Sequence, residues 1–168
     1  MARPGPGIVA TPEKIPLRIY ADTSVFGGCF DPPFLEASRR FFRLVRRQRV
    51  ALLLSEVVGR ELEDAPPRIR RILESLRRRA VREVEITEAV VSLAEAYLAA
   101  EIVGRASRED ATHVAAATVA RADAIVSWNF KDIVGPERIR GYNRINLQAG
   151  YGLLTILPPG MVLPDDKS

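Results

Sequence analysis

The sequence predicts an α/β fold built on a parallel sheet whose two faces are covered by helices. Short apolar runs of strand length alternate along the chain with longer segments in which apolar residues recur at helical spacing. Parallel strands are joined by right-handed crossovers through such helices. Because ligands bind beyond the carboxyl ends of these strands, polar residues that directly follow a strand are the first candidates for a functional site.

The individual elements follow from composition and from the residues that start and stop them. Residues 17–21 are short and apolar and are followed at once by Asp22. Residues 81–86 alternate between apolar and polar side chains, which is typical of an edge strand. Pro32 and Pro67 stand where a helix begins. The predicted strands are 17–21, 50–54, 81–86, 124–128 and 153–157, and the predicted helices are 32–48, 55–65, 67–79, 87–103, 107–122 and 136–147.

Length and composition indicate one globular domain. A chain of 168 residues, 47% hydrophobic and 27% charged, is long enough to bury a substantial core. We predict a flexible lead-in at 1–16, a single domain at 17–157 and a tail at 158–168. No apolar run approaches the roughly 18 residues that span a bilayer, and Pro and Gly interrupt the start of the chain. We therefore expect a cytoplasmic protein without a membrane partner, in which Cys29 is a small buried hydrophobe.

Arginine dominates the basic residues. The net charge is +4, and 22 of the 25 basic residues are arginine, whose planar guanidinium suits phosphates. The arginines are concentrated in two clusters, 39–49 and 68–79. Both clusters also carry apolar residues at helical spacing, so the arginines are equally well explained as solvated helix faces. The sequence leaves open whether either cluster contacts a nucleic acid.

One acid faces the inside of a predicted helix. In segment 55–65, Val57, Val58 and Leu62 form an apolar stripe at about 100° per residue, and Glu61 lies within it. A carboxylate that faces inward needs a partner, because burial of an unpaired charge is costly. An arginine or a metal ion would serve, and the sequence does not decide between them.

Two further acids stand at the ends of elements. Asp22 follows strand 17–21, and Asp110 lies in the first turn of helix 107–122. Each has a structural alternative, Asp22 as a turn residue and Asp110 as the partner of Ser107 in a variant capping box. A parallel sheet would bring Asp22, Asp110 and the inward-facing Glu61 to the same edge. A divalent cation would relieve the repulsion among three carboxylates, and oxygen-only ligands favour Mg²⁺ or Mn²⁺ over zinc.

Polar and aromatic residues after strand 124–128 complete the candidates. Asn129 can add a neutral oxygen ligand, and Asp132 lies three residues later. Trp128 is expected to pack beside the strand end rather than to stack a nucleobase. His113 is the single histidine, which gives no metal-binding pattern, so we expect it on a helix surface.

Three segments resemble a known family in their order and spacing. YADTSVFGG (20–28), SEVVGREL (55–62) and REDATHVAAATVARADAIVSWNF (108–130) resemble the PIN-domain family, and within it the VapC-like toxins of type II toxin-antitoxin systems. The resemblance covers about 17–157. It implies a three-layer α/β/α sandwich around a central parallel sheet, a PIN-like fold with Rossmann-like topology.

The resemblance also implies a role for each matching residue. The family's fourth acid usually lies two residues after a Ser or Thr that ends a strand; counted from Ser127, that position holds Asn129. This departure leaves less negative charge for a second ion and favours a one-metal mechanism. The implied catalytic and metal-binding residues are Asp22, Glu61, Asp110 and Asn129, supported by Thr23, Ser24 and Ser127, with Mg²⁺ or Mn²⁺ as cofactor.

The activity implied is that of a divalent-metal-dependent endoribonuclease. Such an enzyme hydrolyses RNA phosphodiesters to a 5′-phosphate and a 3′-hydroxyl and acts as the toxin of a toxin-antitoxin pair. The implied partners are an RNA substrate, a small antitoxin that occupies the active-site cleft and a second copy of the chain. Asn129 motivates the first alternative, a PIN scaffold that binds RNA or protein without cutting. A receiver-type phosphoacceptor domain is the second, and it needs a lysine near a later strand, for which Lys131 is the sole candidate.

Overall fold

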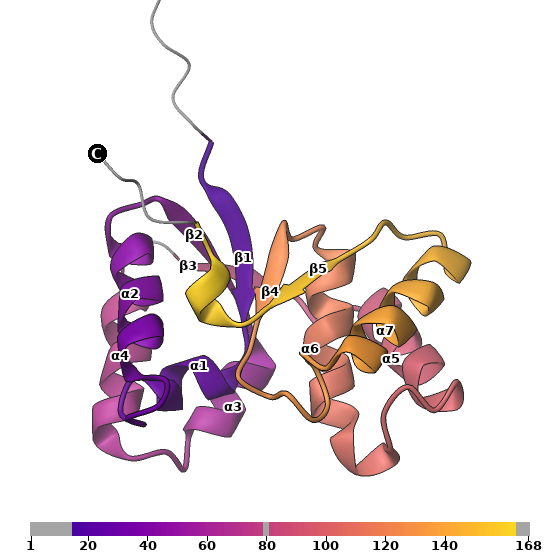
Figure 1. The fold of residues 1–168 in the computed structure, drawn as a ribbon, viewed down its shortest axis with the longest axis horizontal. Coiled ribbons are helices and arrows are strands. Elements are labelled where there is room, and N and C mark those ends of the chain that lie inside the picture. Colours follow the sequence, from indigo (N-terminus) through magenta and orange to yellow (C-terminus); the bar gives the residue numbers. More distant parts are fainter. Residues whose placement is uncertain (1–14, 79–80, 164–168) are drawn as a thin grey trace, which may run out of the picture.

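Two layers of helices enclose one parallel sheet (Figure 1). The computed structural model describes residues 15–78 and 81–163. Neighbouring strands are parallel and lie in the order β3-β2-β1-β4-β5. The predicted α/β class is confirmed. The strands are β1 (Leu17–Ala21), β2 (Val50–Ser55), β3 (Val81–Val84), β4 (Ala124–Val126) and β5 (Thr155–Leu157). The helices are α1 (Thr23–Gly28), α2 (Leu35–Arg46), α3 (Glu56–Leu62), α4 (Pro67–Arg77), α5 (Glu88–Ala99), η1 (Arg105–Ser107), α6 (Arg108–Val119), α7 (Pro136–Gln148) and η2 (Pro159–Met161).

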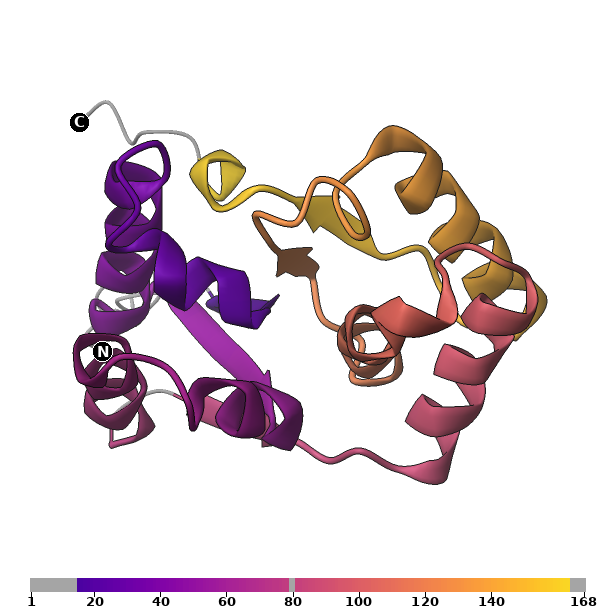
Figure 2. The ribbon, with the colours of Figure 1, turned by 90° about the horizontal axis from the view of Figure 1, so that it is seen from below.

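The strand order reverses beside β1. From β1 the sheet extends to β2 and β3 on one side and to β4 and β5 on the other. The carboxyl ends of β1 and β4 therefore flank the point at which ligands bind in folds of this class. The backbone N–H of Asp22 donates to Val126 O over 3.2 Å and holds these two ends together. Figure 2 is viewed from this edge, with α1 leading away from the end of β1.

Alternating side chains of the sheet fill two separate cores. Tyr20 and Leu53 point toward α5, α6 and α7, whereas Ile19 and Leu52 point toward the layer formed by α1 to α4. Both faces of the central strands are apolar, as expected for a parallel sheet that is covered on both sides. β3 pairs only with β2, among the described residues, so the predicted edge strand is confirmed.

Several boundaries differ from those predicted. The segment TSVFGG, for which no element was predicted, forms α1, because Asp22 adopts an extended backbone and the helix starts at once behind it. The helix expected from residue 32 begins at Leu35, since Asp31 and Phe34 first close a turn with an N–H···O bond of 2.8 Å. In the expected tail, η2 packs against α2 and Val162 is buried. Residues 1–14 of the expected lead-in and 164–168 of the tail lie outside the described residues.

The arginine-rich helices are amphipathic. α2 buries Phe41, Phe42 and Val45, and its arginines at 43 and 46 are exposed. α4 is arranged in the same way around Leu73 and Leu76. Cys29 is buried, as expected. None of the helices within residues 15–78 and 81–163 combines the length and the apolarity required to cross a bilayer.

Gly28 lies beneath the side chain of Trp128 and lets α1 approach it closely. The indole Nε1 donates to Ser38 Oγ over 2.8 Å, and a Cβ atom at Gly28 would collide with that oxygen and lie 2.7 Å from Nε1. Gly28→Ala is therefore expected to destabilise the protein by about 1–3 kcal/mol, the usual cost of overpacking. Urea unfolding followed by the fluorescence of Trp128 measures this directly.

Gly27→Ala is the matched control for this substitution. It lies in the same helix, and its added Cβ would meet nothing within 4 Å. Alanine is favoured over glycine in a helix by about 1 kcal/mol, so this variant should be as stable as the wild type or more stable. Equal losses in both variants would contradict the packing explanation.

Candidate active site at the carboxyl edge of the sheet

Asp22 lies buried at the switch point of the sheet. Its side chain is 4% exposed and makes no capping bond to α1, so the carboxylate is not used to start the helix. Ser24 Oγ donates to Asp22 Oδ1 over 2.6 Å and accepts from the backbone N–H of Trp128 over 2.9 Å. Burial raises the pKa of Asp22, while the charge of His113 and the serine hydrogen bonds act in the opposite direction without offsetting it. The neighbouring groups therefore do not fully compensate the negative charge of the Asp22 carboxylate.

Asp110 faces the same region from the first turn of α6. The capping box predicted as its structural alternative is wrong: Ser107 makes no side-chain cap bond and donates instead to Asp132 Oδ2 over 3.1 Å. Burial raises the pKa of Asp110 to about 6; the charge of His113 lowers it, and the charges of Asp132 and Asp22 raise it further. Like-charged neighbours of this kind disfavour ionisation until a cation joins them.

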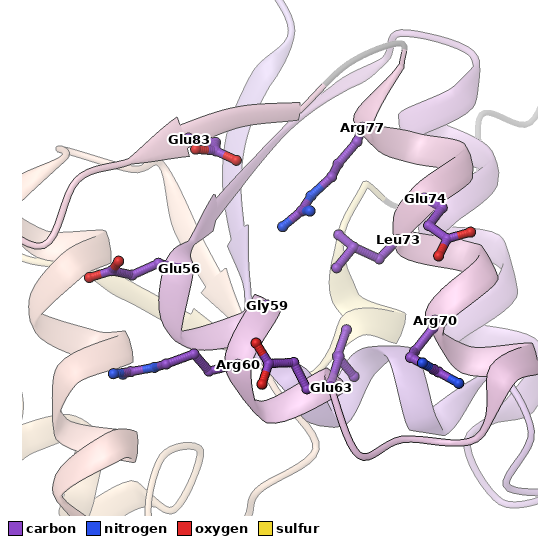
Figure 3. Close-up of a pocket in the computed structure, with 10 residues that line it drawn as sticks. Glu56, Gly59, Arg60, Glu63, Arg70, Leu73, Glu74, Arg77 and Glu83 are labelled. Carbon is purple, nitrogen blue, oxygen red and sulfur yellow. The ribbon is translucent and has the colours of Figure 1, made fainter.

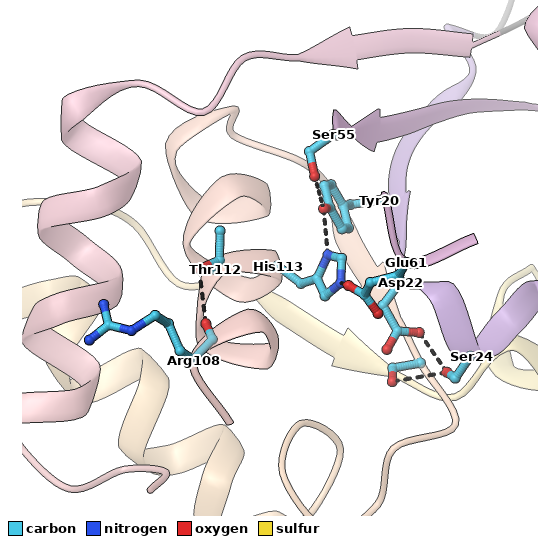
Figure 4. Close-up of polar contacts among 9 residues, drawn as sticks. Tyr20, Asp22, Ser24, Ser55, Glu61, Arg108, Thr112 and His113 are labelled. Atoms are coloured by element: carbon cyan, nitrogen blue, oxygen red, sulfur yellow. Dashed lines mark hydrogen bonds and ion pairs between the residues drawn. The ribbon is translucent and has the colours of Figure 1, made fainter. Parts of the chain in front are cut away.

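Glu61 is paired with the histidine that we expected on a helix surface. His113 is 1% exposed, and its Nε2 lies 2.6 Å from Glu61 Oε1 (Figure 4). On the other side of the ring, Nδ1 lies 2.7 Å from the hydroxyl of Tyr20, which lies 2.7 Å from Ser55 Oγ. When His113 is charged, both ring nitrogens donate, so the Tyr20 hydroxyl accepts from Nδ1 and donates its own hydrogen bond to Ser55 Oγ. The partner of the inward-facing acid is therefore a histidine rather than an arginine.

The pair shifts the pKa of both members toward the charged forms. Burial raises the pKa of Glu61, but the hydrogen bond and the charge of His113 lower it below its ordinary value. Burial lowers the pKa of His113, and the hydrogen bond to Glu61 and the charges of Glu61, Asp22 and Asp110 raise it above its ordinary value. His113 thus supplies the positive charge that this cluster of acids needs in the metal-free protein.

The donor atoms fit a divalent cation held by two acids rather than three. No group of three His, Cys, Asp or Glu side chains within the described part of the chain converges as a metal centre, because Glu61 is turned onto His113. Asp22 and Asp110 remain as two partly or fully buried carboxylates whose charges repel. Thr23 Oγ1, one residue after Asp22, is buried without a hydrogen bond of standard geometry to any described residue, and it lies near the Glu61 carboxylate, whose pKa it lowers. A hard cation would satisfy the oxygens of Asp22 and Asp110.

Known proteins are similar to this chain in structure but not in sequence. No protein-family profile matches the chain, and no curated protein matches its sequence. One chain of a crystal structure of VapBC2 from Rickettsia felis, bound to a DNA fragment from their promoter, matches with a TM-score of 0.51 and 11% identity. The match covers 83% of this chain and 97% of the other. The chain is similar to VapBC2 in fold. At this identity, the likeness extends to the architecture and leaves the residues of the site to be judged by their own geometry.

Asn129 organises the loop that follows β4 in this VapBC2-like fold. Its Oδ1 accepts from the backbone N–H of Asp132 over 3.0 Å, and its side chain lowers the pKa of the nearby Asp110. With the oxygen engaged by the loop, the amide N–H is the group that faces the carboxylate. Asn129 therefore compensates the charge of Asp110 in the metal-free protein, which an acid at this position would not do.

Asn129→Asp is expected to separate metal binding from stability. A third carboxylate beside Asp110 and Asp132 should lower the stability of the metal-free protein by about 1 kcal/mol, the value of a lost hydrogen bond. The added charge should raise the affinity for Mn²⁺, so the rise in Tm upon addition of Mn²⁺ becomes larger than in the wild type. A smaller Mn²⁺-induced rise in Tm would mean that the amide itself is needed beside the ion.

Two residues of this region were underestimated from the sequence. His113 is one turn after Asp110 on α6 and is the single titratable side chain in the apolar run ATHVAAATVA. A position within such an apolar run indicated that His113 lies on the buried face of the helix. Asp132 does not match the family motif, yet it is 9% exposed and its charge acts on Asp110. Trp128 behaves as predicted: its ring stacks on Phe34 with centroids 4.4 Å apart.

A separate pocket lies between α3 and α4 beside β3 (Figure 3). It has a volume of about 450 Å³ and is lined by side chains of both signs, including Arg60, Arg70, Arg77, Glu63 and Glu74. None of the carboxylates at the switch point lines it. The mixture of charges gives this pocket no preference for an anionic ligand, so the switch point remains the candidate site.

Proposed function

We propose that this chain is a divalent-metal-dependent endoribonuclease. The observation that carries the proposal is a pair of carboxylates, Asp22 and Asp110, at the carboxyl edge of a parallel sheet. Burial raises the pKa of both, so both lack a fully compensating positive charge. Mg²⁺ or Mn²⁺, when bound, would neutralise phosphate charge and increase the acidity of water. Asp22 and Asp110 hold the ion. Asn129 positions Asp110, and Ser24 and Ser127 orient the carboxylate of Asp22.

Glu61 and His113 form a hydrogen-bonded ion pair beside the ion. Glu61 contacts His113 through Oε1 and has its pKa lowered by Thr23 as well, yet its side chain is 27% exposed, so its solvent-facing edge can hold a water molecule. His113 anchors Glu61 from the buried side through its link to Tyr20. In this arrangement Glu61 supports the water near the ion and does not have to bind the ion itself.

Two arginines support RNA as the substrate. The guanidinium groups of Arg39 and Arg68 lie over the ring of Phe30, 5.7 and 4.7 Å from its centroid. Arg39 Nε donates to Cys29 O over 2.9 Å, and neither arginine has a carboxylate partner among the described residues. Phe30 follows the end of α1 that is remote from Asp22, and α1 spans about 9 Å at 1.5 Å per residue. Guanidinium groups fixed in this way are suited to the phosphates of a bound strand.

The fold likeness supports an antitoxin partner for the proposed ribonuclease, because the similar structure is of VapBC2 bound to a DNA fragment from their promoter. We propose that this chain is the toxin of a toxin-antitoxin pair, neutralised by a small antitoxin. We further propose that it acts as a homodimer in the cytoplasm, as the sequence resemblance implies.

A scaffold that binds RNA without cutting it is the second candidate. It is favoured by one observation, the engagement of Glu61 by His113 in place of a third metal-facing acid. Incubating tRNA, ribosomal RNA fragments and messenger RNA with the full chain and Mg²⁺, Mn²⁺ or a chelator separates the candidates. The ribonuclease should produce 5′-phosphate ends in the presence of either metal and none with the chelator. Binding without new ends under every metal condition would support the scaffold.

A further inference from the structure

Phe130 presents an exposed aromatic ring beside the candidate active site. It directly follows Asn129, and its side chain is 53% exposed. Its ring centroid lies 6.3 Å from that of Trp128, at an interplanar angle of 48°. A single exposed apolar residue is ordinary on a protein surface, but this one lies on the loop that contacts the carboxylates of the site.

The loop holds this ring in place. The backbone N–H of Phe130 donates to Trp128 O over 3.0 Å, and those of Ile133 and Val134 donate to Asn129 O. Gly135 packs so closely that a Cβ atom there would lie 2.9 Å from Phe130 O. The backbone that carries the ring is therefore held in one conformation, which reduces the entropy lost when a ligand binds to the ring.

Trp128 lies beside this ring and is less exposed than Phe130. One face of the indole is covered by Phe34, and Nε1 is bound to Ser38. Of the aromatic side chains in this loop, Phe130 is the exposed one. The phenyl ring has no hydrogen-bonding group, so it can stack on any nucleobase without distinguishing one from another.

We propose that Phe130 stacks an unpaired nucleobase of the RNA next to the phosphate that is cut; this inference rests on the proposed ribonuclease function. A base within a duplex is already stacked on its neighbours and cannot reach the ring without being extruded. Phe130 thereby selects unpaired over paired RNA, and the arginines over Phe30 hold the phosphates of the same strand.

The test is binding of RNA in the presence of a chelator, with fluorescence of 2-aminopurine placed in a single-stranded oligonucleotide. Phe130→Ala should weaken binding of the single strand about ten-fold, in line with the loss of one stacked base, and should abolish quenching of the 2-aminopurine. Phe130→Tyr should keep both. Phe130→Leu retains apolar bulk without a π face and should behave like Phe130→Ala. Leu153→Ala, an exposed apolar residue that precedes β5, is the matched control and should bind as the wild type.

The outcomes separate the stacking site from the proposed function. Wild-type affinity in Phe130→Ala, unchanged affinity in Phe130→Leu, or an equal loss for duplex RNA would overturn the stacking site, as would no RNA binding by the wild type. Phe130-dependent binding of single strands together with no cleavage in Mg²⁺ or Mn²⁺ would leave the stacking site standing and reject the ribonuclease.

Discussion

Asp22→Asn is expected to abolish metal-dependent RNA cleavage and, at the same time, to stabilise the metal-free protein. Loss of the carboxylate removes a metal ligand, so the cleavage rate should fall by more than the roughly 100-fold typical of an outer partner of a metal site. The amide keeps the shape of the side chain and removes a charge that is 4% exposed. Without that charge, the free energy of unfolding at pH 7 should rise by about 1–2 kcal/mol.

The gain in stability should depend on pH. Because burial raises the pKa of Asp22 in the folded state, ionisation opposes folding. This cost is missing below the ordinary value of 3.8, grows as the pH rises toward the folded value and is complete above it. Urea unfolding in a chelator at several pH values measures the difference between variant and wild type. A variant less stable than the wild type at pH 7 would show that Asp22 serves the fold.

Metal binding offers a readout of Asp22 that does not depend on cleavage. Mn²⁺ should raise the Tm of the wild type through mass action and leave that of Asp22→Asn unchanged. Asp64→Asn is the matched control, because Asp64 is an exposed aspartate outside the site. It should cut RNA and respond to Mn²⁺ as the wild type does.

His113→Ala is expected to cause the largest loss of stability of any single substitution at the site. It leaves a cavity between α6 and β1 and removes the partner of Glu61 and of the buried Tyr20 hydroxyl. Breaking a buried ion pair by removing one member costs about 3–5 kcal/mol, and the partial exposure of Glu61 favours the lower end. A loss of about 3 kcal/mol lowers the Tm of a chain of this size by about 10 °C. Differential scanning calorimetry measures it.

Glu61→Gln tests the charge of this pair while keeping its hydrogen bond. The contribution of His113, whose pKa is raised, is complete below its ordinary value of 6.5 and is lost as the pH rises through the folded value. That of Glu61, whose pKa is lowered, is present above 4.5 and is lost as the pH falls through the folded value. The difference in the free energy of unfolding between wild type and variant should therefore be largest between pH 4.5 and pH 6.5 and smaller at a pH above the folded pKa of His113. A gap that does not change with pH would mean that His113 is neutral.

The α/β architecture was predictable because its signals are local. Apolar runs and helical periodicity are written in neighbouring residues, and they placed Asp22 behind a strand and Glu61 on the inner face of a helix. They missed α1, since TSVFGG has no periodicity long enough to distinguish a short helix from a turn. They also left the ends of helices uncertain, as at Leu35, where a turn delays the start of α2.

Spacing along the chain predicts that Asp22, Glu61 and Asp110 reach the carboxyl edge of the sheet, because it sets strand ends and helix faces. How these side chains pair depends on the packing of the elements. Glu61 and His113 are 52 residues apart and meet because α3 and α6 both contact β2. Asn129 turns its oxygen to its own loop, which leaves its N–H for Asp110. Such choices depend on which donors and acceptors become neighbours upon packing, and no local pattern encodes them.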